Sequence, residues 1–340
     1  MKSNIDVSII IVNYKTAQLV VDCIDSINKE TNKYTYEIVV VDNESNDNSE
    51  EIIKGKHPSI LWIQMGYNSG FARANNAGIK CAKGKYILLL NGDTIVLSNA
   101  IDITIDLLKQ NEKVVACGVQ LLNEDGTTQI SGAKNLKGGL NFLLPIPYLG
   151  KFIRFLGYTF KSTIPSISEV QNFIEVDWII GAFILAKRQA IDNAGLLDED
   201  FFMYAEEMEW CSRLKKQGQL CLFGQPKVIH IGGGSSKDAY NTNGWDNSKD
   251  VWSKKARQIM LSNMVRIRKE FGVGWYLFIQ GVYFLGIPVF ILGWLAESVV
   301  SLGKVKYNWS NIKGYILNII TSSKYLFCIV LNKKTFYKVS

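Results

Sequence analysis

The hydrophobic and polar positions in the first hundred residues form three short apolar runs, and each run stops abruptly at polar side chains. The runs, with the polar residues that end them, are 7–12 (interrupted only by Ser8) before Asn13 and Tyr14, 38–41 before Asp42 and Asn43, and 86–90 before Asn91 and Asp93. Continuous apolar runs of this length are typical of parallel strands covered on both faces. Because the carboxyl ends of parallel strands meet at the edge where open α/β sheets bind ligands, we expect these polar residues to gather there.

Two segments between these runs predict helices. Leu19, Cys23 and Ile27 recur at helical spacing, which predicts an amphipathic helix across the sheet. Residues 66–78 form a glycine-rich segment that leads into a second helix carrying Arg73. Backbone N–H groups at a helix start and a guanidinium group both suit phosphate oxygens. The pattern therefore favours a site for a nucleotide diphosphate, although each polar cluster taken alone also fits ordinary turn chemistry.

Four motifs in this part of the chain follow one another in a recognisable order. They are Ile-Val-Asn-Tyr at 11–14, Val-Val-Asp-Asn-Glu-Ser at 40–45, Asn-Ser-Gly-Phe-Ala-Arg-Ala-Asn-Asn-Ala-Gly at 68–78 and Leu-Asn-Gly-Asp at 90–93. With further segments at 177–182, 201–209 and 228–230, they resemble the inverting family 2 glycosyltransferases, in particular the rhamnosyltransferase-like branch. The resemblance covers residues 5–270. It implies an α/β fold of the GT-A nucleotide-diphospho-sugar transferase type, a Rossmann-like mixed sheet flanked by helices.

The resemblance assigns most of the polar residues to a nucleotide-sugar donor. Asp42 would bind the base in a pocket lined by Asn13 and Tyr14, and Arg73 with Asn76 would face the sugar and the diphosphate. The whole set implied for donor binding is Asn13, Tyr14, Asp42, Asn43, Gly70, Phe71, Arg73, Asn76, Asn91 and Asp93.

Asn91 and Asp93 occupy the position of the family's Asp-x-Asp motif, whose last carboxylate holds a divalent cation against the diphosphate. The first carboxylate is an amide here, so Asp93 needs a further ligand. His230 is the expected ligand, because it ends an apolar run and matches a family position, and imidazole suits Mn²⁺ better than Mg²⁺. The alternative is a histidine that only binds a backbone carbonyl. The other histidine, His57, precedes a proline in a polar linker and is expected at the surface.

An inverting transfer also needs a base that deprotonates the acceptor hydroxyl. Our candidate is Glu207, near the start of a predicted helix with three glutamates, and Glu206 is the alternative. The family usually has Glu-Asp here with the Asp as base, so Glu207 is longer by one methylene. Glu209 and Arg213 lie four residues apart and are expected to pair. The competing interpretation is that these glutamates only complement the helix macrodipole.

Residues 177–182 begin another apolar segment, which the resemblance places beneath the sugar and the acceptor. Asp177, Trp178 and Gly181 are the expected substrate-binding residues of this segment. Asp177 stands at a strand start, where its carboxylate can accept hydrogen bonds from sugar hydroxyls. Trp178 fits a purely structural role equally well, because aromatic side chains dominate the packing of many cores.

Length and composition bound the domain organisation. The chain has 340 residues, 47% of them hydrophobic, which suffices for a catalytic domain and an appendage. We expect a catalytic domain at 1–250, with a nucleotide-binding half at 1–98 and an acceptor half at 99–250, and a helical membrane-associating region at 251–340. Six cysteines without paired or metal-ligand spacing indicate a reducing compartment, and the early core strand argues against a signal peptide.

The C-terminal region is both basic and apolar. Residues 251–340 contain 13 Lys or Arg and 2 Glu, a net charge of +11, whereas the whole chain carries +7 and the preceding part therefore −4. Residues 273–296 are nearly all apolar and exceed the roughly 20 residues that cross a bilayer. A single span and an in-plane hairpin both fit, at an anionic cytoplasmic leaflet. The alternative is a helix buried against the catalytic domain or in a homodimer interface.

These observations favour a metal-dependent inverting glycosyltransferase on the cytoplasmic side of a bacterial membrane, working in surface polysaccharide and cell-wall assembly. The expected partners are a nucleotide-diphospho-sugar donor, preferably dTDP-L-rhamnose, a glycan or polyprenyl-linked glycan acceptor, Mn²⁺ or Mg²⁺, and an anionic membrane surface, without nucleic acid. The choice of donor rests on the resemblance. A UDP-sugar-dependent transferase and a non-catalytic nucleotide-sugar-binding scaffold are the alternatives. A nucleotidyltransferase is disfavoured, because residues 13–16 lack the glycine-rich loop expected after its first strand.

Overall fold

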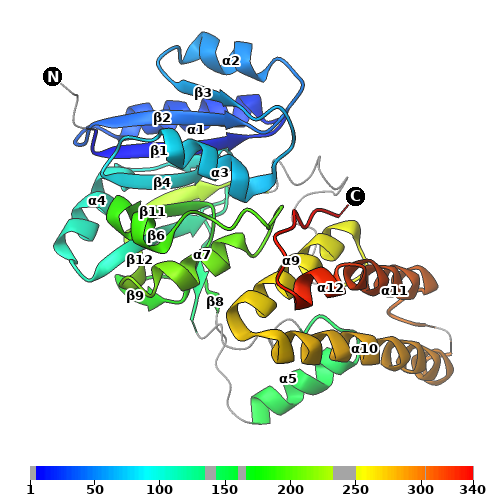
Figure 1. The fold of residues 1–340 in the computed structure, drawn as a ribbon. Coiled ribbons are helices and arrows are strands. Elements are labelled where there is room, and N and C mark those ends of the chain that lie inside the picture. The colour runs from blue at the N-terminus through cyan, green and yellow to red at the C-terminus, as the bar shows by residue number, and fades with distance from the viewer. Residues whose placement is uncertain (1–4, 135–142, 160–165, 233–249, 303, 340) are drawn as a thin grey trace. The chain divides into compact units, whose positions relative to one another are not determined.

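The computed structural model of the protein describes residues 5–134, 143–159, 166–232, 250–302 and 304–339 (Figure 1). The chain forms two compact units. The first consists of Met1–Leu136, Pro165–Glu199 and Glu206–Trp245, and the second of Lys137–Ile164, Asp200–Ala205 and Asp246–Ser340. The second unit thus gathers the basic C-terminal region with two segments from earlier in the chain, while the division at residue 250 stays a prediction.

The first unit is built on a mixed β-sheet. In the described part of the chain, eight of its nine strands follow the order β3-β2-β1-β4-β11-β6-β12-β5, and the ninth, β9, pairs with β12. The strands are β1 (Val7–Asn13), β2 (Tyr36–Asp42), β3 (Leu61–Gln64), β4 (Tyr86–Asn91), β5 (Thr94–Val96), β6 (Val114–Leu122), β9 (Phe173–Val176), β11 (Phe183–Lys187) and β12 (Gln219–His230). A smaller sheet has the order β10-β7-β8, from β7 (Gly132–Ala133), β8 (Ser166–Ile167) and β10 (Trp178–Ile179).

The strands predicted from the three apolar runs are confirmed at the centre of the sheet. β1 lies between β2 and β4 and runs parallel to both. Ile9, Ile10 and Ile11 are fully buried, as expected of a strand covered on both faces. β11 runs antiparallel to β4 and to β6, which makes the sheet mixed. The predicted α/β class, a mixed sheet flanked by helices, is therefore confirmed.

Helices cover both faces of this sheet. Those of the first unit are α1 (Ala17–Glu30), α2 (Ser49–Lys56), α3 (Gly70–Cys81), α4 (Ala100–Gln110), α6 (Arg188–Ala194) and α7 (Glu206–Leu214). Because side chains alternate along a strand, Ile9 and Ile11 pack with α1 and α4, whereas Ile10 packs with α3, α6 and α7. Cys23 and Ile27 on α1 are fully buried, which confirms the predicted amphipathic helix.

A glycine sets the close packing of α3 on β1. A Cβ atom added at Gly78 would lie 2.5 Å from Ile10 Cγ2 and 3.3 Å from Val41 Cγ2. Atoms at 2.5 Å overlap, so any larger residue here must displace the helix or the strand side chain. The motif residue Gly78 therefore sets how closely α3 packs on β1.

The second unit is helical. Its helices are α5 (Leu149–Thr159), α9 (Lys254–Phe271), α10 (Val273–Val300), α11 (Trp309–Ser323) and α12 (Leu326–Val330). Its core is aromatic: the ring of Phe290 lies 5.8 Å from that of Tyr315 and 5.2 Å from that of Tyr307, and Tyr315 donates a hydrogen bond to the backbone of Tyr283. The elements in this core come from α9, α10 and α11, so the three helices form one packed assembly.

α10 is the predicted long apolar helix. Among the described residues it is the one helix that is long and apolar enough to cross a membrane, with a mean hydropathy of 1.8 over its most apolar stretch. Of that stretch, 28% is buried inside the unit. Length and composition are therefore compatible with a span, but they do not by themselves distinguish a span from a helix packed on others.

The expectation of a surface position for His57 is wrong. His57 caps the C-terminus of α2 and is only 8% exposed. Its Nε2 lies 3.2 Å from the Asp25 carboxylate on α1. The neighbouring helix covers the polar linker, which the local sequence does not reveal.

We predict that Gly78→Ala lowers the free energy of unfolding by about 1–3 kcal/mol, because an added methyl group overpacks the contact between α3 and β1. Equilibrium unfolding in urea, followed by circular dichroism, measures this change.

Gly55→Ala is the matched control. Gly55 lies on α2, and no heavy atom comes within 4 Å of an added Cβ. The higher helix propensity of alanine should leave this variant as stable as the parent or more stable by up to about 1 kcal/mol. Equal stability of the two variants would show that the close packing at Gly78 is wrong.

Candidate active site

The polar ends of β1, β2 and β4 meet at one edge of the sheet, as predicted. In the strand registers Asn13 pairs with Asp42, and Val12 pairs with Asn91. Asn13 is fully buried and Asp42 is 3% exposed. Three strands distant in sequence thus present their polar residues side by side.

Asp42 is held by donors of the chain itself. Its carboxylate accepts hydrogen bonds from Asn13 Nδ2 at 2.7 Å, from the Ser45 backbone at 3.0 Å and from Gln64 Nε2 at 2.8 Å. These bonds order the loop after β2. Tyr14 is half-buried beside them, and the ammonium of Lys15 lies 5.5 Å from its ring centre. Contacts of Asp42, Asn13 and Tyr14 with a nucleotide base stay a prediction.

Asn43 fixes the glycine-rich loop that begins α3. Its Oδ1 accepts bonds from the backbone and the hydroxyl of Ser69 at 2.8 and 2.7 Å, and its Nδ2 donates to the carbonyl of Gly70 at 3.4 Å. Gly70 has a φ of +75°, a left-handed conformation that favours glycine. The N-terminus of α3 is therefore held next to the end of β2, where its backbone N–H groups suit an anion.

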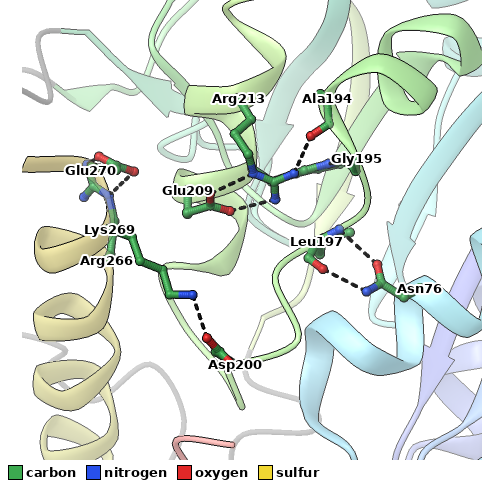
Figure 2. A network of polar contacts seen from close by, with 11 residues as sticks. Asn76, Ala194, Gly195, Leu197, Asp200, Glu209, Arg213, Arg266, Lys269 and Glu270 are labelled. Carbon is green, nitrogen blue, oxygen red and sulfur yellow. Dashed lines mark hydrogen bonds and ion pairs between the residues drawn. The ribbon is translucent and has the colours of Figure 1, made fainter. Parts of the chain in front are cut away.

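Arg73 and Asn76 both bind the segment that precedes α7. Asn76 Nδ2 donates to the carbonyl of Leu197 at 2.8 Å, and the Leu197 N–H donates to Asn76 Oδ1 at 3.0 Å (Figure 2). Arg73 Nε donates to the carbonyl of Glu199 at 2.9 Å, and its NH1 lies 3.4 Å from the Tyr67 hydroxyl. Since both ends of the Asn76 amide are engaged by backbone, we do not carry Asn76 forward as a donor ligand, whereas Arg73 keeps that proposed role.

Asn91, Asp93 and His230 lie together. His230 Nε2 lies 3.5 Å from Asp93 Oδ1 and 3.4 Å from Asn91 Nδ2. The antiparallel pairing of β12 with β5 sets this arrangement, because it places His230 opposite Thr94, next to Asp93. His230 is 6% exposed, so its ring has little freedom. Sequence reasoning thus named three residues that the fold brings into one cluster.

Gln129 is a member of this cluster that sequence reasoning missed. Its Oε1 lies 2.9 Å from His230 Nδ1, while its Nε2 donates to the His230 carbonyl at 3.0 Å and to Asn123 Oδ1 at 2.7 Å. The two bonds from Nε2 fix the amide orientation, so Nδ1 carries a proton and donates it to Oε1. In the neutral imidazole the lone pair is then on Nε2, which faces Asp93.

The donor set fits one divalent cation. Two ligand atoms about 2.1 Å from the same ion lie about 3.0–3.5 Å apart, and the spacing of Asp93 Oδ1 and His230 Nε2 is 3.5 Å. No cluster of three or more His, Cys, Asp or Glu suited to a metal occurs among the described residues. Further ligands would therefore come from a bound diphosphate and water, as is common for such ions.

Cys23 is close to this cluster but does not contribute a thiolate. Its Sγ lies 3.8 Å from the Asn91 carbonyl and 3.4 Å from the Thr94 hydroxyl. Burial raises the pKa of the thiol to about 12, so it is protonated at neutral pH. A metal bound at this edge would therefore have oxygen and imidazole ligands.

Glu207 lies near a second group of predicted residues. A Cβ atom added at Gly181 would lie 3.5 Å from Phe71 Cζ and 3.8 Å from Glu207 Cγ. Phe71 is on α3, Glu207 is on α7, and Gly181 lies in the turn between β10 and β11. The Asn91 N–H donates to the carbonyl of Ala182 at 3.0 Å, which joins this turn to the end of β4. The side chains of Phe71 and Glu207, which come from two helices, therefore both lie next to Gly181 beside the sheet edge.

The other glutamates of α7 are arranged differently. Glu206 is 3% exposed, whereas Glu207 is half-buried. Glu209 forms a bidentate pair with Arg213, with both distances 2.7 Å, and Arg213 also donates to the Ala194 carbonyl (Figure 2). The predicted pairing of Glu209 and Arg213 is confirmed. This pair connects α7 to α6 and leaves Glu207 on another side of the helix.

The backbone just before α7 is strained. Tyr204 and Ala205 have φ values of +71° and +68°, which non-glycine residues rarely adopt. Such conformations persist where the surrounding structure holds them and are common at functional sites.

Asp177 and Trp178 have distinct environments. Asp177 forms an ion pair with Lys215 of the segment after α7. Trp178 is half-buried, and its Nε1 is buried with no hydrogen-bond partner in the described ranges. A buried indole N–H of this kind is available to a ligand oxygen. The structure therefore favours Trp178 over Asp177 as a substrate contact, and both roles stay predictions.

Known proteins similar to this chain are glycan-synthesising transferases. The family described as Glycosyl transferase family 2 matches residues 8–168. The low-salt glycan biosynthesis hexosyltransferase of Haloferax volcanii is 25% identical over 89% of this chain and 87% of its own length. The N-acetylglucosaminyl-diphospho-decaprenol L-rhamnosyltransferase of Mycobacterium tuberculosis is 23% identical over 57% of this chain and 66% of its own length. The poly(ribitol-phosphate) beta-glucosyltransferase of Bacillus spizizenii is 35% identical over 33% of this chain and 18% of its own length.

A solved structure supports the fold. The crystal structure of GalNAc-T7 with UDP, GalNAc and Mn²⁺ is similar with a TM-score of 0.51 at 17% identity, over 78% of this chain and 48% of that chain. The chain thus spans less than two thirds of the length of three of these four proteins. Residues 8–168 therefore match glycosyltransferase family 2, and the relatives and the mixed sheet agree with a transferase of GT-A fold.

Proposed function

We propose that this glycosyltransferase moves a sugar from a nucleotide-diphospho-sugar to a glycan acceptor with inversion at the anomeric carbon. The observation that carries the proposal is the cluster of Asp93, His230 and Asn91 at the end of β4, with Nε2 of the imidazole on the side of Asp93. A divalent cation bound there would offset the negative charge of the leaving diphosphate. Mn²⁺ suits the mixed oxygen and imidazole ligands better than Mg²⁺ does.

The other residues of the candidate site position the reactants. The N-terminus of α3 and Arg73 bind the diphosphate, and Asp42 with Asn13 and Tyr14 forms the base pocket. Glu207 takes the proton from the acceptor hydroxyl while the oxygen of that hydroxyl attacks the anomeric carbon and the nucleoside diphosphate leaves. The close approach of Glu207, Phe71 and Gly181 supports this role, because it brings the Glu207 side chain beside the start of α3. Glu206 is the alternative base.

The preferred donor is dTDP-L-rhamnose and the preferred acceptor is a lipid-linked glycan of bacterial surface polysaccharide. The rhamnosyltransferase of M. tuberculosis, which is 23% identical to this chain, supports an L-rhamnosyl donor and a polyprenyl-diphosphate-linked acceptor. A UDP-sugar is the second candidate, because the GalNAc-T7 structure contains UDP. A lipid-linked acceptor would place the enzyme at the cytoplasmic face of the membrane, where the basic residues of 251–340 would meet anionic lipid. A homodimer is compatible with this function.

Donor choice is tested with the full chain, Mn²⁺ and a panel of dTDP-, UDP- and GDP-sugars, with mass spectrometry of the released nucleotide and sugar. We expect turnover of dTDP-L-rhamnose at a rate at least tenfold above that of the other donors. Turnover of a UDP-sugar instead would change the assigned donor but not the proposed transferase activity. Binding of donors without any turnover, in the presence of a panel of glycan acceptors, would favour the non-catalytic scaffold.

The base is tested by Glu207→Gln. We expect transfer to fall by about 10²–10⁴-fold, the usual contribution of a general base, while donor affinity stays unchanged. Rates of transfer and calorimetric donor binding measure the two effects. Glu206→Gln is the comparison variant and should retain most of the activity. The reverse result would make Glu206 the base, and full activity of both variants would exclude this pair.

The metal site is tested by binding of Mn²⁺ in the presence of the nucleoside diphosphate, measured by electron paramagnetic resonance. We expect Gln129→Met to weaken Mn²⁺ binding by about 10–100-fold, because the residue that orients a metal-binding histidine typically contributes that much. His230→Ala should weaken binding at least as strongly.

A spectroscopic measurement separates orientation of His230 from general structural damage. Nitrogen NMR of the metal-free protein should show the proton of His230 on Nδ1, and Gln129→Met should remove that preference. His57→Gln, at the other histidine of the chain, is the control and should leave Mn²⁺ affinity unchanged. Mn²⁺ affinities that are equal in wild type, Gln129→Met and His230→Ala would exclude His230 from the metal site.

A further inference from the structure

α10 has two faces with different surroundings. The residues of the buried face recur every three to four positions and include Tyr276, Ile279, Tyr283, Gly286 and Phe290. The opposite side is also apolar but exposed, and we call it the outer stripe. The outer stripe consists of Leu277, Phe278, Leu285, Leu292, Leu295 and Val299. Leu285 and Leu292 are each 65% exposed and Val299 is 78% exposed, so this side of the helix is bare from Leu277 to Val299.

A membrane-spanning orientation of α10 is inconsistent with the packing of other helices on its buried face. A helix of 28 residues is about 42 Å long, longer than the hydrocarbon core. α9 and α11 pack against the buried face, so a spanning α10 would carry both helices into the lipid. α9 includes Arg266, which is 2% exposed and paired with Glu270 at 2.8 Å. Charged groups and helix ends of this kind are costly in hydrocarbon.

Polar contacts fasten α10 to its neighbours at both ends. Near the start, Gln280 Nε2 donates to the Ser323 hydroxyl of α11 at 3.1 Å. Near the end, Trp294 Nε1 donates to the carbonyl of Tyr307 at 3.0 Å, and Glu297 accepts a bond from the Tyr148 hydroxyl at 2.6 Å. The helix is therefore a fixed part of its unit, and only the outer stripe is available to a partner.

The surroundings of the outer stripe are basic. Lys304 and Lys306 are exposed directly after α10, and residues 251–340 carry a net charge of +11. α5 lies alongside α10 (Figure 1), and the ring of Tyr148, directly before α5, packs against that of Phe290. The exposed side chains of α5 also combine apolar and basic residues. Phe152 and Phe155 are 58% and 66% exposed, with Lys151 before them and Arg154 between them. Apolar surface beside Lys and Arg complements an anionic lipid surface.

We propose that the outer stripe of α10 lies in the plane of an anionic bilayer and enters one leaflet only, so that the second unit is a monotopic membrane anchor. Both ends of α10 then stay on the same side of the membrane. The lysines after α10 contact lipid phosphates while the leucines reach the acyl boundary. The assignment to the cytoplasmic leaflet rests on the proposed function, whereas the in-plane mode rests on the contacts of the helix.

Vesicle binding tests the surface. The full chain is mixed with preformed vesicles of phosphatidylcholine alone or with 30% phosphatidylglycerol, roughly the anionic content that gives an appreciable surface potential, and bound protein is recovered by flotation. We expect at least tenfold tighter binding to the anionic vesicles, and at least tenfold loss of that binding in Leu285→Glu/Leu292→Glu. Equal binding of wild type and this variant would overturn the proposal.

The matched control places the same charges on exposed apolar positions of the first unit. Ile52→Glu/Leu61→Glu, at residues 38% and 43% exposed, should bind anionic vesicles like the wild type. Transfer to a water-soluble acceptor should be unchanged in the outer-stripe variant, so that loss of anchoring is distinguishable from failure of the proposed activity. If the purified chain is instead a dimer that the outer-stripe variant dissociates, with vesicle binding unaltered, the stripe is an interface between copies and the proposal is wrong.

Cysteine labelling tests the in-plane mode. Gly274→Cys and Lys304→Cys place single thiols at the two ends of α10, in a chain in which Cys81 and Cys328 are replaced by serine. An impermeant maleimide is applied to right-side-out and to inverted membrane vesicles from cells that express the chain. We expect both thiols to react only in inverted vesicles. Reaction of the two ends on opposite sides would show a span and overturn the proposal.

Discussion

Buried parallel strands can present polar side chains only where they end, and this constraint determines where the chemistry of the chain is located. The strand registers bring the ends of β1, β2 and β4 into line, and the hydrogen bond from Asn13 to Asp42 closes the first two together. Asn43, directly after β2, then accepts a hydrogen bond from the Ser69 backbone and so fixes the start of α3. Each step uses a residue at the end of a buried strand to support the next, so the proposed donor site is assembled before any ligand binds.

The sequence predicted those parts of the site that lie next to strong local patterns. The ends of the parallel strands, the helix after the glycine-rich loop and the pair of Glu209 with Arg213 all follow from periodicity and spacing. Gln129 was not predictable in this way, because it reaches His230 from a loop 101 residues earlier in the chain and its own neighbours show no motif. Asn76 shows the reverse case: the motif is present, but both ends of its amide bind the backbone of Leu197.

The second unit shows a different limit. α10 is apolar on all sides, so its periodicity does not distinguish the face that packs on other helices from the face that is bare. Aromatic core and lipid-facing residues have the same composition, and only the contacts of Tyr283 and Phe290 with Tyr315 reveal which side is interior. The segments at 143–159 and 200–205 join this unit through tertiary contacts, which local sequence does not encode.

The amide at Asn91 changes the electrostatics of the proposed metal site. Two carboxylates would cancel the charge of a divalent cation, whereas Asp93 with a neutral His230 leaves a net charge of about +1 toward the diphosphate. Such a site binds its cation less tightly alone but stabilises negative charge on the leaving group more strongly. Cation and donor then strengthen each other's binding by the same factor. Gln129 suits this arrangement, because an amide orients the imidazole without adding the negative charge that a carboxylate partner would bring.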